Sequence, residues 1–106
     1  MIVRSWSGKV PGAHAAGFLD HLRATGVAEY QAEPGCRDVR IWRRDEDGWA
    51  RFTLVSLWTD MTAIRAWAGD DCAVAVLYPG DEAFGLVPDL RVEHFELVFA
   101  EPGATP

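Results

Sequence analysis

Residues 49–58 constrain the fold most strongly, because they predict a strand that is apolar on both faces. Alternation along the strand puts Phe52, Leu54 and Trp58 on one face, against Val55 and Leu57 on the other. A strand with two apolar faces needs cover on both sides of its sheet. The chain must therefore supply helices for one face and obtain cover for the other.

The rest of the pattern predicts three more strands and two main helices. We expect strands over 2–10, 36–44 and 90–99, and helices over about 13–25 and 61–68. The turn at 45–48 ends in Asp-Gly, which favours a hairpin between the second and third strands. The βαββαβ order predicts an α+β, ferredoxin-like fold, with a four-stranded antiparallel sheet and both helices on one face.

Capping residues predict where the helices begin and end. Gly26 is the expected end of the first helix, because glycine accepts the left-handed conformation that closes a helix. Thr59-Asp60 supplies side-chain oxygens for the start of the second helix. Asp70-Asp71 predicts a further short helix over 72–77, followed by a loop over 81–88.

The length of 106 residues fits one domain, which we place at 1–99, with a frayed tail at 100–106. Helices on one face leave the other face of the sheet bare. Self-association about a two-fold axis is the simplest way to cover it, so the sequence predicts a homodimer.

Composition excludes several classes of function. A net charge of −6 argues against nucleic acid as a partner, because phosphate binding needs a basic surface. No stretch approaches the roughly 20 apolar residues of a membrane span, and no signal peptide is visible. Cys36 and Cys72 form no disulfide or metal-ligand pattern, so we expect no metal and a reducing, cytoplasmic location.

Three polar residues among aromatic ones are candidate catalytic groups. Arg4 shares a strand face with Trp6, which is unusual unless the arginine meets an anion; the alternative is a rim arginine paired with Glu93 or Glu96. His94, in the last strand, is either a general base or a satisfied structural residue. Tyr78, before Pro79-Gly80, either points its hydroxyl into a cleft or anchors a helix end.

Large aromatic residues are the candidate walls of a pocket. Five tryptophans in so short a chain exceed what one thin core encloses. We assign substrate binding to Trp6, Trp58, Trp67 and Phe84. The alternative for Trp58 and Trp67 is ordinary core packing.

Several segments resemble the antibiotic biosynthesis monooxygenase (ABM) superfamily. They are residues 1–6, His21-Leu22-Arg23, Pro34-Gly35-Cys36, Leu57-Trp58, the 64–67 helix, 78–81 and Glu93-His94-Phe95. The resemblance covers about residues 1–99. It implies a dimeric α/β barrel with a pocket between sheet and helices in each subunit.

The superfamily has two relevant activities. Some members are cofactor-free monooxygenases that deprotonate aromatic polyketides and react them directly with oxygen. Others degrade haem, using an asparagine on the first strand, a tryptophan on the second main helix and a histidine ligand near its end. Trp67 matches the tryptophan of both groups, but the chain has no asparagine, and residues 76–78 contain no histidine.

The leading hypothesis is therefore a cofactor-independent monooxygenase, or a related enzyme, acting on a planar aromatic, polyketide-like small molecule. Arg4 and His94 would polarise or deprotonate a phenol or enol, and Tyr78 would orient it. The alternatives are a non-catalytic small-ligand-binding or stress-response protein and, disfavoured, a haem-binding or haem-degrading monooxygenase.

Overall fold

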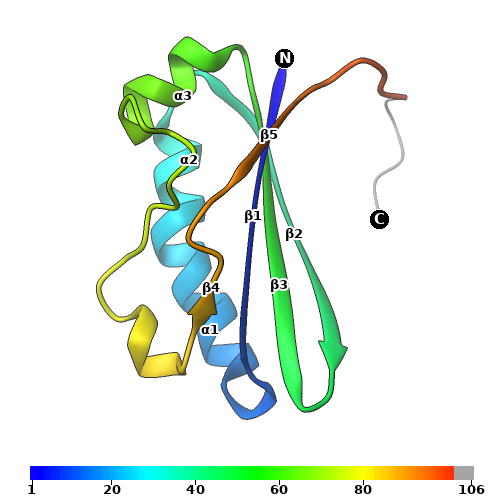
Figure 1. Cartoon of the computed structure of the whole chain (residues 1–106), viewed down its shortest axis with the longest axis vertical. Coiled ribbons are helices and arrows are strands. Elements are labelled where there is room, and N and C mark those ends of the chain that lie inside the picture. The colour runs from blue at the N-terminus through cyan, green and yellow to red at the C-terminus, as the bar shows by residue number, and fades with distance from the viewer. Residues whose placement is uncertain (102–106) are drawn as a thin grey trace.

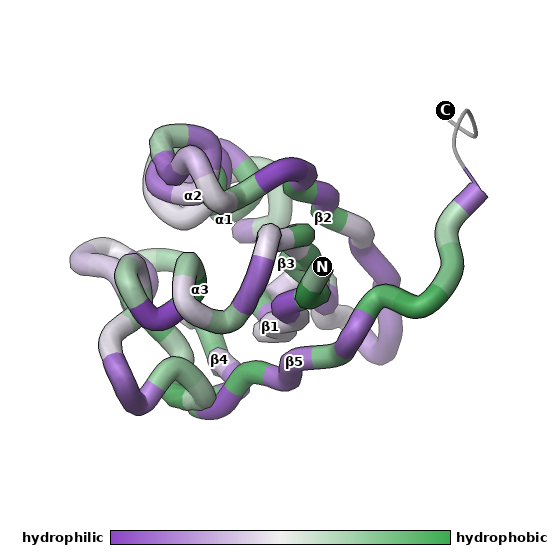
Figure 2. The backbone as a smooth tube through the Cα atoms, turned by 90° about the horizontal axis from the view of Figure 1, so that it is seen from above, coloured by the Kyte–Doolittle hydropathy of each residue, from purple (hydrophilic) through white to green (hydrophobic). Residues whose placement is uncertain are grey.

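The computed structural model describes residues 1–101, so 102–106 of the predicted tail lie outside the described residues. The strands are β1 (Ile2–Pro11), β2 (Cys36–Glu46), β3 (Trp49–Trp58), β4 (Val87–Pro88) and β5 (Glu93–Glu96). The α-helices are α1 (Ala15–Leu22), α2 (Ala28–Ala32) and α3 (Met61–Ala68). The helices lie along one face of the sheet and leave the other face uncovered (Figures 1 and 2). The predicted α+β fold is confirmed.

The sheet is antiparallel, with the order β2-β3-β1 and then β4 and β5 along the same edge of β1. β2 and β3 meet at a two-residue turn, Asp47-Gly48, whose φ angles of 53° and 81° suit a hairpin. Direct pairing places Arg4 opposite Ser56 on β3 and opposite His94 on β5. These three residues therefore share the face that the helices cover.

Alternation along β1 and β3 has the predicted register. Every second residue is buried, from Arg4 to Val10 on β1 and from Ala50 to Trp58 on β3. The intervening side chains face the uncovered side, where Phe95, Val3 and Leu57 form one row across three strands. The expectation of apolar residues on both faces is met by this row.

The first helix does not end at Gly26, contrary to expectation. A π-helical segment, Arg23–Val27, carries the chain without a break from α1 into α2. Gly26 is buried within it, where an added Cβ would lie 3.6 Å from Leu54 and 3.7 Å from Tyr78. The Thr25 hydroxyl donates to the His21 carbonyl at 2.8 Å, an interaction that competes with the regular helical ladder. Glycine here allows close packing rather than a helix end, and the helix continues through Tyr30.

The segment after α3 also differs from the prediction. α3 ends at Gly69 as expected, with φ at 89°, but no helix forms over 72–77. Instead, the Ala75 amide donates to the Leu90 carbonyl, and the Val92 amide donates to the Ala73 carbonyl. Extended pairing suits the β-branched residues of this segment better than a helix does.

The last strand is shorter than predicted. In place of one strand over 90–99, β4 pairs with the Gly8 end of β1 and β5 with its Ile2 end. Between them the chain pairs with residues 73–75, which interrupts the ladder along β1. The expected loop over 81–88 contains a 3-10 helix, Asp81–Phe84, and β4.

Substituting Asp60 tests the capping of α3. The Asp60 carboxylate accepts from the Ala63 amide at 2.8 Å. We expect Asp60→Ala to lower the free energy of unfolding by about 1 kcal/mol, measured by urea denaturation. Asp60→Asn keeps a capping oxygen and should retain nearly all of the stability. Equal losses in both variants would contradict a capping role.

Candidate active site

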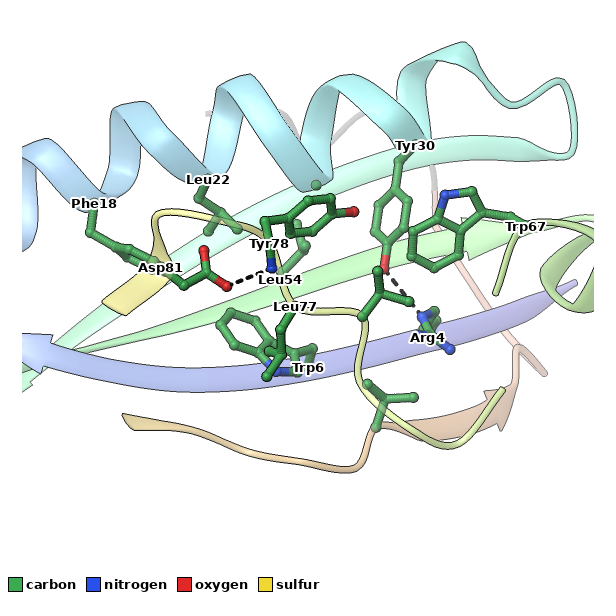
Figure 3. A pocket seen from close by; sticks show the side chains of 13 residues that line it. Arg4, Trp6, Phe18, Leu22, Tyr30, Leu54, Trp67, Leu77, Tyr78 and Asp81 are labelled. Carbon is green, nitrogen blue, oxygen red and sulfur yellow. Dashed lines mark hydrogen bonds between the residues drawn. The ribbon is translucent and has the colours of Figure 1, made fainter. Parts of the chain in front are cut away.

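A pocket lies between the covered face of the sheet and the helices, closed on one side by residues 76–81 (Figure 3). Its empty space is about 410 Å³ counted out to the mouth, and little of that is wide enough for a water molecule. The lining is mostly apolar and aromatic: Arg4, Trp6, Phe18, Leu22, Gly26, Tyr30, Leu54, Trp67, Val76, Leu77, Tyr78, Asp81 and Val92.

Arg4 is the buried charge of this pocket, with only 1% of its surface exposed. Its Nε donates to the Tyr30 hydroxyl at 3.2 Å, and its Nη1 donates to the Cys72 carbonyl at 2.6 Å. The guanidinium carbon also lies 5.2 Å from the centre of the Trp67 ring. Arg4 is not a rim residue paired with Glu93 or Glu96, because it contacts the pocket side of the sheet.

His94 does not line the pocket, although it shares the covered face. Its Nε2 lies 3.0 Å from Arg4 Nη1, close enough to form a hydrogen bond with the guanidinium. Burial lowers the pKa of His94, and the charges of Arg4 and Arg65 lower it further. His94 is therefore neutral near pH 7 and accepts the hydrogen bond from Arg4.

Tyr30 is the functional residue that the sequence analysis missed. Burial raises the pKa of its hydroxyl, which keeps Tyr30 protonated. Its ring packs edge-on against two tryptophans, with 4.7 Å between the ring centres for Trp67 and 5.4 Å for Trp58. The sequence analysis ended the helix at Gly26 and so did not place Tyr30 near the sheet. In the structure the helix continues and brings Tyr30 over the sheet.

The four predicted aromatic walls divide into two pairs. Trp6 and Trp67 line the pocket, and Trp6 is held by a 3.0 Å hydrogen bond from its Nε1 to the Asp89 carbonyl. Trp58 is completely buried behind Tyr30 and Trp67 and donates to the Ser56 hydroxyl at 2.8 Å. Phe84 packs against Phe18 instead of facing the cavity. The second pair supports the walls and does not form them.

Tyr78 lies in the pocket at the mouth. Its hydroxyl donates to Glu29 Oε1 at 3.1 Å, and the same oxygen accepts from Trp67 Nε1 at 3.1 Å. Burial and the neighbouring Glu29 carboxylate raise the pKa of Tyr78 well above its usual range. Glu29, another residue that the sequence analysis did not single out, thus joins α2, α3 and the 76–81 segment.

Asp81 lines the end of the pocket opposite Arg4 (Figure 3). One carboxylate oxygen lies 2.7 Å from His21 Nε2, and the other accepts from the Tyr78 amide at 2.9 Å. The His21 side chain is only 16% exposed, whereas His14 is exposed. The pocket has a cation at one end and a carboxylate at the other.

The residues lining the pocket do not fit a haem group. They include no histidine, cysteine or methionine, the common axial ligands. Tyr30 and Tyr78 are present, but their raised pKa values disfavour the phenolate that would bind iron. The described residues also contain no cluster of three or more acidic, histidine or cysteine side chains for a metal ion. Over the same residues, no helix is long and apolar enough to cross a membrane.

The family model for antibiotic biosynthesis monooxygenases matches residues 1–74 of the 106-residue chain. The chain belongs to the antibiotic biosynthesis monooxygenase family. The ABM resemblance noted from the sequence is thereby confirmed. No protein of curated function matches the chain.

Solved structures share the fold of this ABM protein at low sequence identity. A Deinococcus radiodurans structure assigned to the same family is 18% identical, with a TM-score of 0.66, covering 99% of this chain and 100% of that one. A mutant of SnoaB, a cofactor-independent oxygenase from Streptomyces nogalater, is 20% identical with a TM-score of 0.55, covering 96% and 98%. A mutant of MhuD with two manganese protoporphyrin IX molecules bound per active site is 21% identical with a TM-score of 0.60, covering 97% and 100%.

The neutral state of His94 predicts a pH dependence of stability. Because the folded-state pKa lies below the unfolded value, protons bind more readily to the unfolded chain. The stabilisation from neutral His94 is complete above about pH 6.5, the unfolded pKa, and is lost as pH falls toward the folded pKa. We expect urea denaturation to show a smaller loss of stability between pH 7.5 and pH 5 in His94→Gln than in the unmodified protein. His14→Gln, at an exposed site, should behave as the unmodified protein does.

Proposed function

We propose that this ABM protein is a cofactor-independent oxygenase that acts on a planar aromatic molecule with an acidic enol or phenol. The main observation in support of this proposal is Arg4, a buried cation in a pocket lined by Trp6, Tyr30 and Trp67. Flat aromatic walls favour a planar ligand, and a fixed guanidinium stabilises an oxyanion. Family membership and the fold shared with SnoaB support the same class of reaction.

The proposed chemistry needs only the substrate anion and oxygen. The enolate carbon forms a bond to O₂ and gives a peroxide, whose O–O bond then breaks. One oxygen stays on the carbon as a carbonyl and the other leaves as hydroxide, which becomes water by taking up a proton equivalent to the one lost when the anion formed. Overall a CH₂ group loses four electrons and O₂ gains four. Arg4 balances the negative charge on the enolate oxygen, His94 positions Arg4, and Tyr78 orients the ligand at the mouth.

Entry of a ligand requires movement of the pocket wall. The space is too narrow for a fused-ring molecule while Val76, Leu77 and Tyr78 occupy their present positions. This segment carries the half-exposed Leu77 and is joined to α2 through the Tyr78–Glu29 hydrogen bond. We propose that it moves outward as the ligand enters.

Oxygen uptake tests the proposed activity. We expect the purified protein to consume O₂ with an anthrone or a hydroxynaphthalene that is ionised at the pH of the assay, measured with an oxygen electrode. Arg4→Gln should lower kcat by roughly 100-fold, the usual effect of removing one oxyanion-stabilising group. Arg37→Gln, which changes an exposed arginine outside the pocket, should leave kcat unchanged. Thermal stabilisation by these ligands without O₂ consumption would instead favour a binding protein.

We also propose that the uncovered face of the sheet pairs with a second copy of the chain. Phe95, Val3 and Leu57 form an apolar row on this face, and in the segment that follows β5 Val98 and Phe99 are 88% and 80% exposed. This terminal segment runs away from the sheet on the side opposite the helices (Figure 2). It carries Glu101, whereas the far end of the uncovered face carries Lys9, Arg44 and Arg51, with Glu46 beside the two arginines. A two-fold arrangement would bring the acidic segment of each copy to the basic end of the other.

Light scattering tests the homodimer. We expect a dimeric mass at micromolar concentration, and we expect Phe99→Glu to shift it toward the monomer by placing a charge in the apolar contact. Ala16→Glu, an exposed change on the helix side, should remain dimeric. A monomeric mass for the unmodified protein would contradict the proposal.

Both cysteines are free, which supports the proposed cytoplasmic location.

A further inference from the structure

The charge of Arg4 is not balanced within the protein. Among residues 1–101, no aspartate or glutamate oxygen lies within 4 Å of its guanidinium. Its partners are the Tyr30 hydroxyl, the Cys72 carbonyl and the His94 ring, none of which is an anion. These bonds use Nε and Nη1, and the described residues provide no hydrogen-bond partner for Nη2. A buried cation without a counter-ion is costly, and a bound anion removes that cost.

Beside Arg4 the pocket has no basic side chain to take a proton from a ligand. A guanidinium is not deprotonated in proteins, and Tyr30 and Tyr78 have raised pKa values. Asp81, the carboxylate of the lining, lies at the opposite end, where its oxygens accept hydrogen bonds from His21 and from the Tyr78 amide. His94 lies outside the cavity with Nε2 against Arg4. A neutral ligand would therefore have to lose its proton before it enters.

We infer that the pocket selects planar aromatic molecules that are already anions in neutral solution, with the oxyanion against Arg4 and no charge at the other end. Acidic hydroxyquinones and enolised 1,3-diketones share this chemistry as substrates, and aryl carboxylates, which have no enolate carbon, share it as ligands that do not react. Asp81, at the opposite end from Arg4, repels a second anionic group (Figure 3). This inference rests on the pocket of the proposed function and specifies its substrate class, but the binding step needs no oxygen.

Matched ligands test the selectivity on the unmodified protein. Isothermal titration under nitrogen compares 2-naphthoate with the neutral isostere 2-naphthamide. We expect the carboxylate to bind roughly tenfold tighter or more, because a charge-assisted hydrogen bond replaces a neutral one. The dianion 2,6-naphthalenedicarboxylate should bind more weakly than 2-naphthoate, because its second charge lies toward Asp81. Equal affinity for acid and amide, tighter binding of the dianion, or no binding of 2-naphthoate at millimolar concentration would overturn the inference.

Two substitutions test whether Arg4 is the source of the selectivity for anions. In Arg4→Gln the ratio of acid to amide affinity should fall to about one, whereas Arg37→Gln should keep the ratio of the unmodified protein. A ratio that survives in a folded Arg4→Gln protein would overturn the inference; if that variant does not fold, the ligand comparison on the unmodified protein decides. Anion-selective binding without any oxygen uptake would contradict the proposed oxygenase and leave this inference standing. Oxygen uptake with no preference for anions would support the proposed oxygenase and overturn this inference.

Discussion

The burial of Arg4 is the constraint on which the arrangement of the site depends. A guanidinium without water must find acceptors inside the protein, and Arg4 takes them from three separate segments. Tyr30 comes from α2, the Cys72 carbonyl from the chain after α3, and His94 from β5. The one side chain therefore joins α2, the chain after α3 and β5 to β1. Each segment is held in the position that the pocket needs.

The irregular parts of the fold follow from this requirement. In a regular helix over 72–77 the Cys72 carbonyl would point along the helix axis toward the amide four residues on, whereas in the structure it accepts from Arg4. Pairing of residues 73–75 with 90–92 turns the carbonyl toward the sheet and separates β4 from β5. The π-helical segment at 23–27 carries the helix on toward Tyr30 and lets Gly26 approach Leu54 and Tyr78. Irregular backbone is concentrated where the pocket is built.

The pocket is polarised along its length, with Arg4 at one end and Asp81 at the other. The Asp81 carboxylate accepts hydrogen bonds from His21 and from the Tyr78 amide, so both of its oxygens have partners within the chain. Arg4 has no carboxylate partner among the described residues. The difference gives the two ends distinct functions in our proposal, one that binds an anion and one that rejects it. The Glu29 contacts to Tyr78 and Trp67 then close the mouth between them.

The sequence by itself determined the βαββαβ order, the two-sided apolar strands, the hairpin turn and the cap of α3. These features depend on the alternation of residues between the two faces of a strand and on the backbone preferences of turn and cap residues. Both can be seen in short stretches of sequence. It also placed Arg4 and Trp6 on one strand face, but it left open whether Arg4 is buried or pairs with a glutamate at the rim. Only the tertiary structure decided that His94 contacts Arg4 outside the pocket, that Trp58 and Phe84 lie behind the walls, and that Tyr30 and Asp81 join the lining, with Glu29 bonded to Tyr78 and Trp67. Those contacts join residues tens of positions apart, and no local pattern records which distant acceptor a buried donor will find.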